Sequence, residues 1–309
     1  MRRLGREGWV GMALVMLLAC VGLWAPAFFE PQPLWTRLAS WMPRLVVAAG
    51  VAVVMVARHI DISVGSVLGV SGVVGGMVIA AGLPAWAGMA AAVSCGALAG
   101  ALNGWWVAGL RLPSIVVTLA TMVAWREGLR WGRQGVFVNL PDTAVWMGLP
   151  MVAGQGLVIA AGLGAVAGLG WWMRNMASGR WVAAMGSNPE AGRLAGIPAG
   201  WVTGGTFVVS GSMAGLGAAL LLVQSPQVDP ASGRLLELEA VAAAVVGGVS
   251  IRGGAGRMRG VLAGFLLLAC VGPALTYLGV KAYWDKAIHG VVILAAAAMA
   301  ARAGGKQAT

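Results

Sequence analysis

Charged side chains are scarce in this sequence: only 10% of its 309 residues are Asp, Glu, Lys or Arg, whereas an ordinary soluble domain has about 25%. Hydrophobic residues make up 59% of the chain. They fall in runs of roughly 15 to 24 residues, about the length that crosses a ~30 Å hydrocarbon core as a helix. These features exclude an ordinary water-soluble fold and predict an all-α membrane protein.

Cysteine and histidine are also rare. The three cysteines all lie inside apolar runs and the two histidines stand far apart, so the sequence indicates neither a disulfide framework nor a metal site. We find no cluster of paired acids or of His with metal ligands, and we therefore expect neither an enzyme nor a bound cofactor. The net charge of +11 is scattered between the apolar runs, a pattern that argues against nucleic-acid binding.

The apolar runs divide the chain into a single transmembrane domain, residues 1–309, with about ten predicted spans. Ten crossings place both termini on one side of the membrane. With the N-terminus inside, thirteen of the 21 basic residues face the cytoplasm, which is the distribution that the positive-inside rule favours. The predicted spans are 9–26, 43–57, 63–82, 86–109, 114–131, 152–173, 203–223, 236–250, 259–279 and 287–302.

A polar stretch between the second and third spans contains Arg58, His59, Asp61, Ser63 and Ser66. Charged residues at bilayer depth usually face a cavity or a partner. One interpretation is a broken-helix element that lines a solute pathway. The other is a cytoplasmic turn in which Asp61 caps the next helix.

The longest inward-facing loop predicts a short surface helix. Asn188 can cap this helix, with Pro189 at its first position and Glu190 in its first turn. Composition alone leaves two interpretations open, a contact for a cytosolic partner and a solvated turn.

Two further features, a group of acidic residues and a glycine-rich run, have simpler explanations than a binding site. Glu237, Glu239 and Asp229 could be solute ligands or a proton relay, but a solvated end of a span is the simpler interpretation. The glycine-rich run 247–256 lacks the Lys-Ser/Thr pair of a phosphate-binding loop. Closely packed backbone at the membrane boundary explains its glycines better.

Four motifs, in this order within a chain of about ten spans, resemble the permease family of ribose-type ABC importers. The matching segments are Ile-Asp-Ile-Ser-Val-Gly-Ser at 60–66, Pro-Ser-Ile-Val-Val-Thr-Leu-Ala-Thr-Met at 113–122, the Asn-Pro-Glu-Ala-Gly-Arg-Leu-Ala-Gly-Ile loop at 188–197, and the glycine-rich run 247–256. The resemblance extends over roughly residues 45 to 300. Within the family, the Arg58-His59 form looks closest to the autoinducer-2 and rhamnose permeases.

The resemblance implies a type II ABC-importer-like permease in the bacterial inner membrane that imports a small sugar or sugar-like solute such as ribose, rhamnose or autoinducer-2. The implied partners are a cytosolic ATP-binding subunit, a periplasmic substrate-binding protein, and a second permease copy or related permease that completes a dimer. By the same resemblance, the ATPase-coupling residues are Asn188, Glu190, Arg193, Leu194 and Gly196. The substrate-pathway residues are Arg58, His59, Asp61, Ser63, Ser66, Thr118 and Thr121.

The alternative function is a proton-coupled secondary transporter, which would need ionisable residues near the middle of its spans. The predicted spans have almost none. One departure from the family pattern is the charge that Arg126, Glu127 and Arg130 bring near the end of a span.

Overall fold

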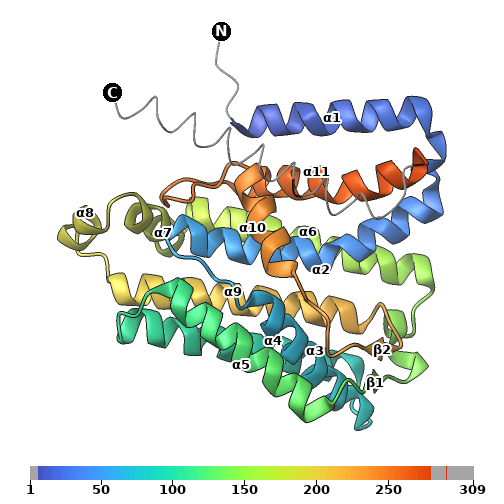
Figure 1. The fold of residues 1–309 in the computed structure, drawn as a ribbon, viewed down its shortest axis with the longest axis horizontal. Helices are drawn as coiled ribbons and strands as arrows, with labels where there is room; N and C mark the ends of the chain where they lie inside the picture. The colour runs from blue at the N-terminus through green and yellow to red at the C-terminus, as the bar shows by residue number, and fades with distance from the viewer. Residues whose placement is uncertain (1–5, 280–289, 291–309) are drawn as a thin grey trace.

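The computed structural model describes residues 6–279 and Gly290. Within this part the chain is almost wholly helical, and the elongated bundle in Figure 1 has most helices nearly parallel to its long axis. The elements are α1 (Arg6–Trp24), η1 (Pro26–Phe29), α2 (Pro31–Val56), α3 (Val64–Ala80), α4 (Ala85–Gly104), η2 (Trp105–Gly109), α5 (Ser114–Arg133), β1 (Val138–Asn139), η3 (Asp142–Gly148), α6 (Met151–Asn175), α7 (Ala177–Ser187), α8 (Pro189–Leu194), α9 (Ala199–Leu222), β2 (Gln227–Val228), α10 (Leu236–Val246) and α11 (Met258–Tyr277).

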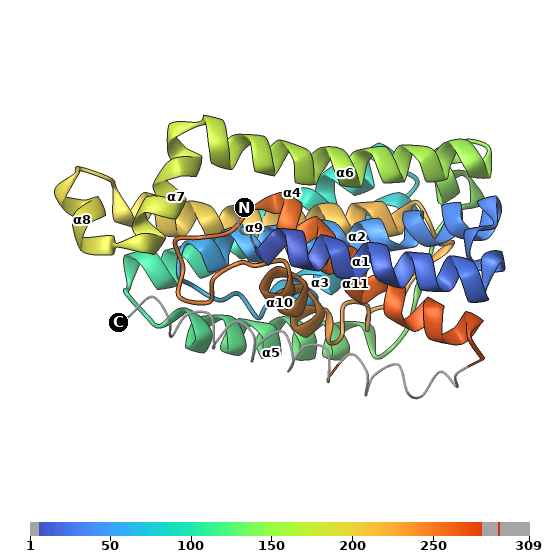
Figure 2. The same cartoon turned by 90° about the horizontal axis from the view of Figure 1, so that it is seen from above.

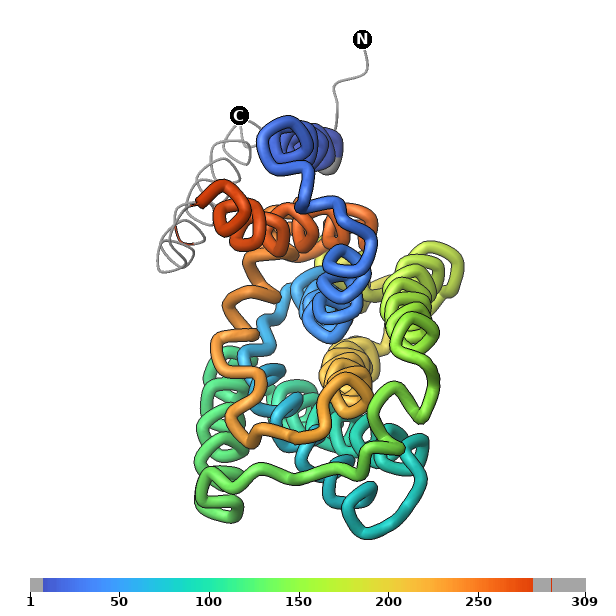
Figure 3. Tube along the Cα trace, turned by 90° about the vertical axis from the view of Figure 1, so that its right-hand side faces the viewer, coloured from blue at the N-terminus to red at the C-terminus, as the bar shows by residue number. Residues whose placement is uncertain are grey.

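The bundle is arranged around α2 and α9. Along its axis, Figure 3 shows α1 and α11 at one edge, α2 and α9 in the middle, and α3, α4 and α5 at the opposite edge. In α2 every residue from Trp41 to Val56 except Arg44 is buried, because helices surround it on all sides. The two short strands β1 and β2 pair antiparallel, with Val138 opposite Val228, and join the loops at one end of the bundle.

Glycines allow α4 and α9 to pack backbone against backbone. Gly96 and Gly100 on α4 face Gly211 and Gly215 on α9, and a Cβ atom added to Gly215 would lie 2.8 Å from the Cα of Val93. Small residues spaced four apart permit this close approach between membrane helices. Any larger side chain at this contact would push the two helices apart.

Five of the described helices are long and apolar enough to cross a membrane: α2, α4 with η2, α6, α9 and α11. The expected spans 9–26 and 63–82 coincide with the shorter apolar helices α1 and α3. The segment expected at 114–131 is the 20-residue helix α5, whose second half carries the charged residues Arg126, Glu127, Arg130 and Arg133.

The segment expected as a span at 236–250 is not one continuous helix. The helix there, α10, has 11 residues and is therefore only about 16 Å long at 1.5 Å per residue. Hydropathy continues into Val246-Gly247-Gly248-Val249, but the backbone turns after Val246 and Gly248 adopts a φ of 88°. The expected span 287–302 lies outside the described residues.

Two interrupted segments therefore meet inside the bundle. The extended segment 57–63 runs back from the end of α2 toward the middle, where α3 begins, and the loop 229–235 enters from the other end to the start of α10 (Figure 1). Gly65 packs against the carbonyl oxygen of Gly233 and the carboxylate of Glu237. A side chain at Gly65 would collide with both groups.

Candidate functional site

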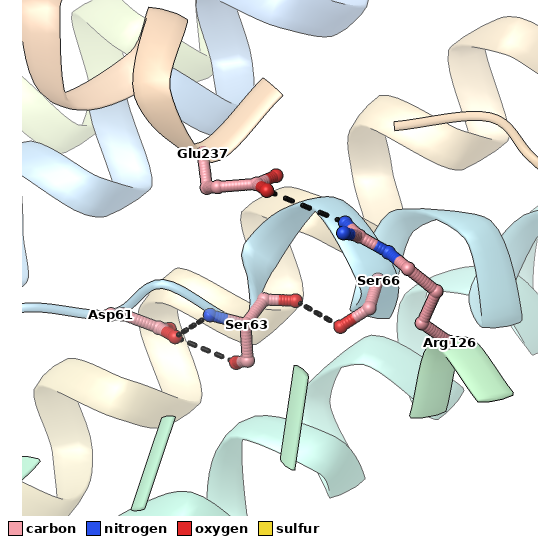
Figure 4. A network of polar contacts seen from close by, with 5 residues as sticks. All are labelled: Asp61, Ser63, Ser66, Arg126 and Glu237. Atoms are coloured by element: carbon pink, nitrogen blue, oxygen red, sulfur yellow. Dashed lines mark hydrogen bonds and ion pairs between the residues drawn. The ribbon is translucent and has the colours of Figure 1, made fainter. Parts of the chain in front are cut away.

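The carboxylate of Asp61 holds the interrupted start of α3. Asp61 is 1% exposed, and its Oδ1 accepts hydrogen bonds from the backbone N–H (3.0 Å) and the hydroxyl (2.6 Å) of Ser63. Its Oδ2 accepts a bond from the Ser210 hydroxyl on α9 at 2.8 Å. The close-up in Figure 4 shows Asp61 at the turn that leads into α3. Asp61 thus bonds the backbone at the start of this helix, but it does so in the interior of the bundle.

Neighbouring helices hold the same segment from two other sides. Asn103 at the end of α4 donates from Nδ2 to the Ser63 hydroxyl at 2.9 Å. On α5, the Thr118 hydroxyl lies 3.3 Å from the carbonyl oxygen of Ile60, and the Ser114 hydroxyl accepts from the Ile60 N–H at 3.4 Å. The start of α3 is therefore tied to α4, α5 and α9 together.

The remaining residues expected along a pathway have varied surroundings. Arg58 is exposed at the end of α2, and His59 lies beside Phe207 with its Nε2 3.4 Å from the Thr203 hydroxyl. Thr121 is buried and bonds the carbonyl oxygen of Val117 within its own helix. Ser66 differs from all of these, because it lines a cavity.

This cavity, here called the vestibule, lies between the first turns of α3, the second half of α5 and the loop before α10. It encloses about 530 Å³ of empty space, part of it open to solvent. Seven of its twelve lining residues are polar or charged, and the others are small or apolar: Ser66, Gly69, Arg126, Glu127, Leu129, Arg130, Gly135, Asp229, Pro230, Ala231, Ser232 and Arg234.

An ion pair between Arg126 on α5 and Glu237 on α10 borders the vestibule. The Arg126 Nη2 lies 3.4 Å from the Glu237 Oε1, and the two residues approach over the start of α3 (Figure 4). Glu237 is 5% exposed, so a solvated end of a span is wrong for this residue. A solvated end of a span does describe Glu239, whose side chain is half-exposed and whose Oε2 lies 3.7 Å from the Nη1 of Arg44. Arg126 and Glu237 are 111 positions apart in the sequence. No pattern in a single sequence indicates that their side chains are in contact.

The short helix expected in the longest loop is present as α8. The Asn188 Oδ1 accepts hydrogen bonds from the N–H groups of Glu190 (3.1 Å) and Ala191 (3.0 Å), with Pro189 at the first helical position. Figures 1 and 2 show α8 projecting beyond one end of the bundle. Leu194 is 86% exposed at its end, and Gly196 takes a φ of 77° in the turn that follows. Glu190, Arg193 and Leu194 therefore all stand on a protruding surface.

The glycine-rich run after α10 packs closely, as its composition predicts. The Gly254 N–H donates to the carbonyl oxygen of Val56 at 2.8 Å. Gly253 and Gly254 have φ values of 82° and 77°, a region that glycine adopts without strain. A Cβ on Gly254 would lie 2.6 Å from the Cα of Ser187. The run thus joins the ends of α2 and α7. Among residues 6–279, no group of three His, Cys, Asp or Glu could hold a metal ion.

Known proteins resemble this chain over most of its length. Residues 35–297 match the family described as branched-chain amino acid transport system / permease component. The autoinducer 2 import system permease protein of Enterobacter sp. (strain 638) is 32% identical over 92% of this chain and 83% of its own length. The ribose import permease protein of Escherichia coli (strain K12) is 32% identical over 92% of this chain and 90% of its own.

A third relative, the autoinducer 2 import system permease protein of Yersinia pseudotuberculosis (strain IP 31758), is 31% identical over 94% of this chain and 83% of its own length. Identity is thus nearly the same for the ribose and autoinducer 2 permeases, so it does not separate these two solutes. The family expected from the four motifs is confirmed: the chain belongs to the permease family of ribose-type ABC importers.

Proposed function

We propose that this chain is the membrane-spanning permease subunit of an ATP-driven importer that brings a small sugar or sugar-like solute into a bacterial cell. The observation that supports it best is the likeness to ribose and autoinducer 2 import permeases over more than nine-tenths of the chain. The projecting helix α8 and the vestibule provide the two surfaces that such a subunit needs, one for a source of energy and one for a solute.

The energy enters from a separate subunit, because the sequence has no phosphate-binding loop of its own. A cytosolic ATP-binding protein receives α8 in a groove, and its closure on ATP moves α8 and α7. Asn188 shapes this surface through its cap, Gly196 through its turn, and Glu190, Arg193 and Leu194 by direct contact. A periplasmic binding protein delivers the solute at the opposite end, and a second permease copy or related permease completes the pathway.

The orientation follows from the distribution of charge. Basic residues gather at the helix ends and loops near α8, which makes this end cytoplasmic under the positive-inside rule. The chain crosses the inner membrane about ten times as one domain, with the interrupted segments at α3 and α10 inside it and both termini in the cytoplasm. These basic residues include Arg58, Arg111, Arg174, Arg180, Arg193, Arg252 and Arg257.

Reconstitution tests the proposal. Vesicles that contain this permease, its partner permease, the ATPase and the loaded binding protein should accumulate solute only with ATP, and vesicles without the ATPase should accumulate none. Accumulation by the permease alone, abolished by a protonophore, would establish the proton-coupled alternative instead. Radiolabelled D-ribose, L-rhamnose and autoinducer 2 are the first solutes to measure.

A charge reversal on α8 tests the coupling surface. Glu190→Lys should reduce co-purification of the ATPase and cut transport about tenfold or more, because one unfavourable contact of about 1.4 kcal/mol changes an equilibrium tenfold. Asp142→Lys, an exposed reversal at the far end of the bundle, is the matched control and should leave ATPase co-purification unchanged. Equal co-purification of the ATPase with both variants would remove α8 from the interface.

A further inference from the structure

We propose that the vestibule binds a neutral, polyhydroxylated solute, and that Arg126, which pairs with Glu237, is its recognition residue. This inference rests on the proposed function. It assigns solute contact to residues other than Asp61 and its hydrogen-bond partners Ser63 and Ser210. Asp61, Ser63 and Thr118 are 1% exposed or less and line no described cavity. Ser66 is the one residue of the 60–66 motif that lines the vestibule.

The balance of charge around the vestibule favours a neutral solute. Its lining carries three guanidinium groups, those of Arg126, Arg130 and Arg234, and the carboxylates of Glu127 and Asp229. Arg130 pairs with Glu127 at 3.5 Å, and Arg126 pairs with Glu237 behind the lining. In number, these three positive groups are balanced by three carboxylates, those of Glu127, Asp229 and Glu237. An anionic solute would find no net attraction here, whereas hydroxyl groups, which both donate and accept, fit a mixed lining.

Arg126 has one weak ion-pair contact and several free hydrogen-bond donors. Its side chain is 28% exposed, and one nitrogen of the guanidinium faces Glu237. A guanidinium has five N–H donors in a rigid plane, so several remain for solute hydroxyls on the vestibule side. Glu237 has an Oε2 atom without a hydrogen-bond partner among the described residues. This carboxylate is therefore available to follow Arg126 when a solute alters the guanidinium position.

Ser66 supplies a second contact. Its hydroxyl donates to the carbonyl oxygen of Ser63 at 2.7 Å, which leaves the Ser66 oxygen free to accept a hydrogen bond from the solute. Because Ser63 is bonded to Asp61, a solute in the vestibule touches the same segment that links α3 to α4 and α9. A solute that binds Ser66 can therefore shift the hydrogen-bonded segment at the start of α3.

Transport kinetics test the recognition role. In the reconstituted importer, Arg126→Lys keeps a positive charge near Glu237 but removes the planar fork, and should raise the KM for the accumulated neutral probe about tenfold with little change in maximal rate. Arg133→Lys is the matched control, because Arg133 lies outside the vestibule and bonds the carbonyl oxygens of Val136 and Phe137. It should change KM less than twofold.

The probes are D-ribose, L-rhamnose and autoinducer 2, with D-ribose 5-phosphate and D-glucuronate as anionic counterparts. ATP-dependent uptake of anions but not of neutral probes would overturn the neutral class, and an unchanged KM in Arg126→Lys would overturn the recognition role. A KM raised equally by Arg133→Lys would also overturn it. If the unmodified importer accumulates no probe with ATP, the proposed function itself fails.

Thiol labelling keeps the inference testable if Arg126→Lys does not assemble. In an importer with Arg126 intact and alanine in place of Cys20, Cys95 and Cys270, Ser232→Cys places a thiol on the vestibule lining. The neutral probe that the importer accumulates should slow labelling of this thiol by a maleimide at least fivefold. Labelling at the same rate with and without that probe would place the solute elsewhere.

Discussion

The interrupted helix starts at α3 and α10 each carry a buried carboxylate, but the two carboxylates are held very differently. Asp61 receives three hydrogen bonds of 2.6 to 3.0 Å from Ser63 and Ser210. Glu237 has one contact of 3.4 Å with Arg126 and one oxygen without a partner among the described residues. Both are at least 95% buried, so burial alone does not distinguish them.

The difference separates a structural carboxylate from one that is able to change partners. Burying a polar group is costly unless hydrogen bonds compensate, and Asp61 receives three such bonds from Ser63 and from Ser210 on α9. Glu237 receives only one among the described residues, and its partner Arg126 borders a cavity. An incompletely bonded pair next to a solvent-open space can rearrange at little energetic cost, which a transport cycle with two states requires.

The largest expected effect follows from removing each carboxylate in turn. Asp61→Ala leaves three buried donors without their acceptor, at about 1–3 kcal/mol for each unsatisfied group, and should abolish folding or lower the unfolding temperature sharply in detergent. Glu237→Ala should destabilise the protein much less, because Arg126 reaches the vestibule. Thermal unfolding of both variants measures this. Equal losses of stability would show that the two carboxylates have the same role.

Local features of the fold were predictable from the sequence. The cap at Asn188 and the helix behind it follow from Asn-Pro-Glu, because a cap involves only neighbouring residues. The close packing of Gly253 and Gly254 follows from composition, since glycine alone tolerates such φ values. For Asp61 the sequence permits both a helix cap and a group that lines a solute pathway, and the structure shows that it bonds the helix start while being buried.

Long-range features were not predictable. Hydropathy continues past Val246, so the end of α10 depends on the turn at Gly248 and not on polarity. Glu237 was assigned to solvent because acidic residues at span ends usually are solvated. Its burial requires Gly65 and Gly233 to approach each other, and no local pattern encodes that approach. The vestibule, built from three separate segments, was missed for the same reason.

A smaller effect on stability is expected from removing one hydrogen bond of Asp61, the one donated by Ser210. Ser210→Ala removes the hydrogen bond from α9 and should lower the free energy of unfolding by about 1–2 kcal/mol. Ser212→Ala, two positions along α9 and half-buried, is the matched control and should change it by less than about 0.5 kcal/mol. Chemical or thermal unfolding in detergent distinguishes them. Indistinguishable variants would mean that Ser210 does not hold Asp61.

The smallest expected effect concerns the Arg126–Glu237 pair itself. A double-mutant cycle with Arg126→Gln and Glu237→Gln should give a coupling energy for unfolding below about 1 kcal/mol, because the contact is single, 3.4 Å long and partly solvated. The coupling between Asp61→Asn and Ser210→Ala should be larger. If the Arg126–Glu237 coupling is the larger of the two, the pair is a rigid clamp, and a guanidinium fixed so firmly would not be free to respond to a solute. A small coupling energy, combined with an altered KM for Arg126→Lys, would instead show that this pair contributes more to transport than to stability.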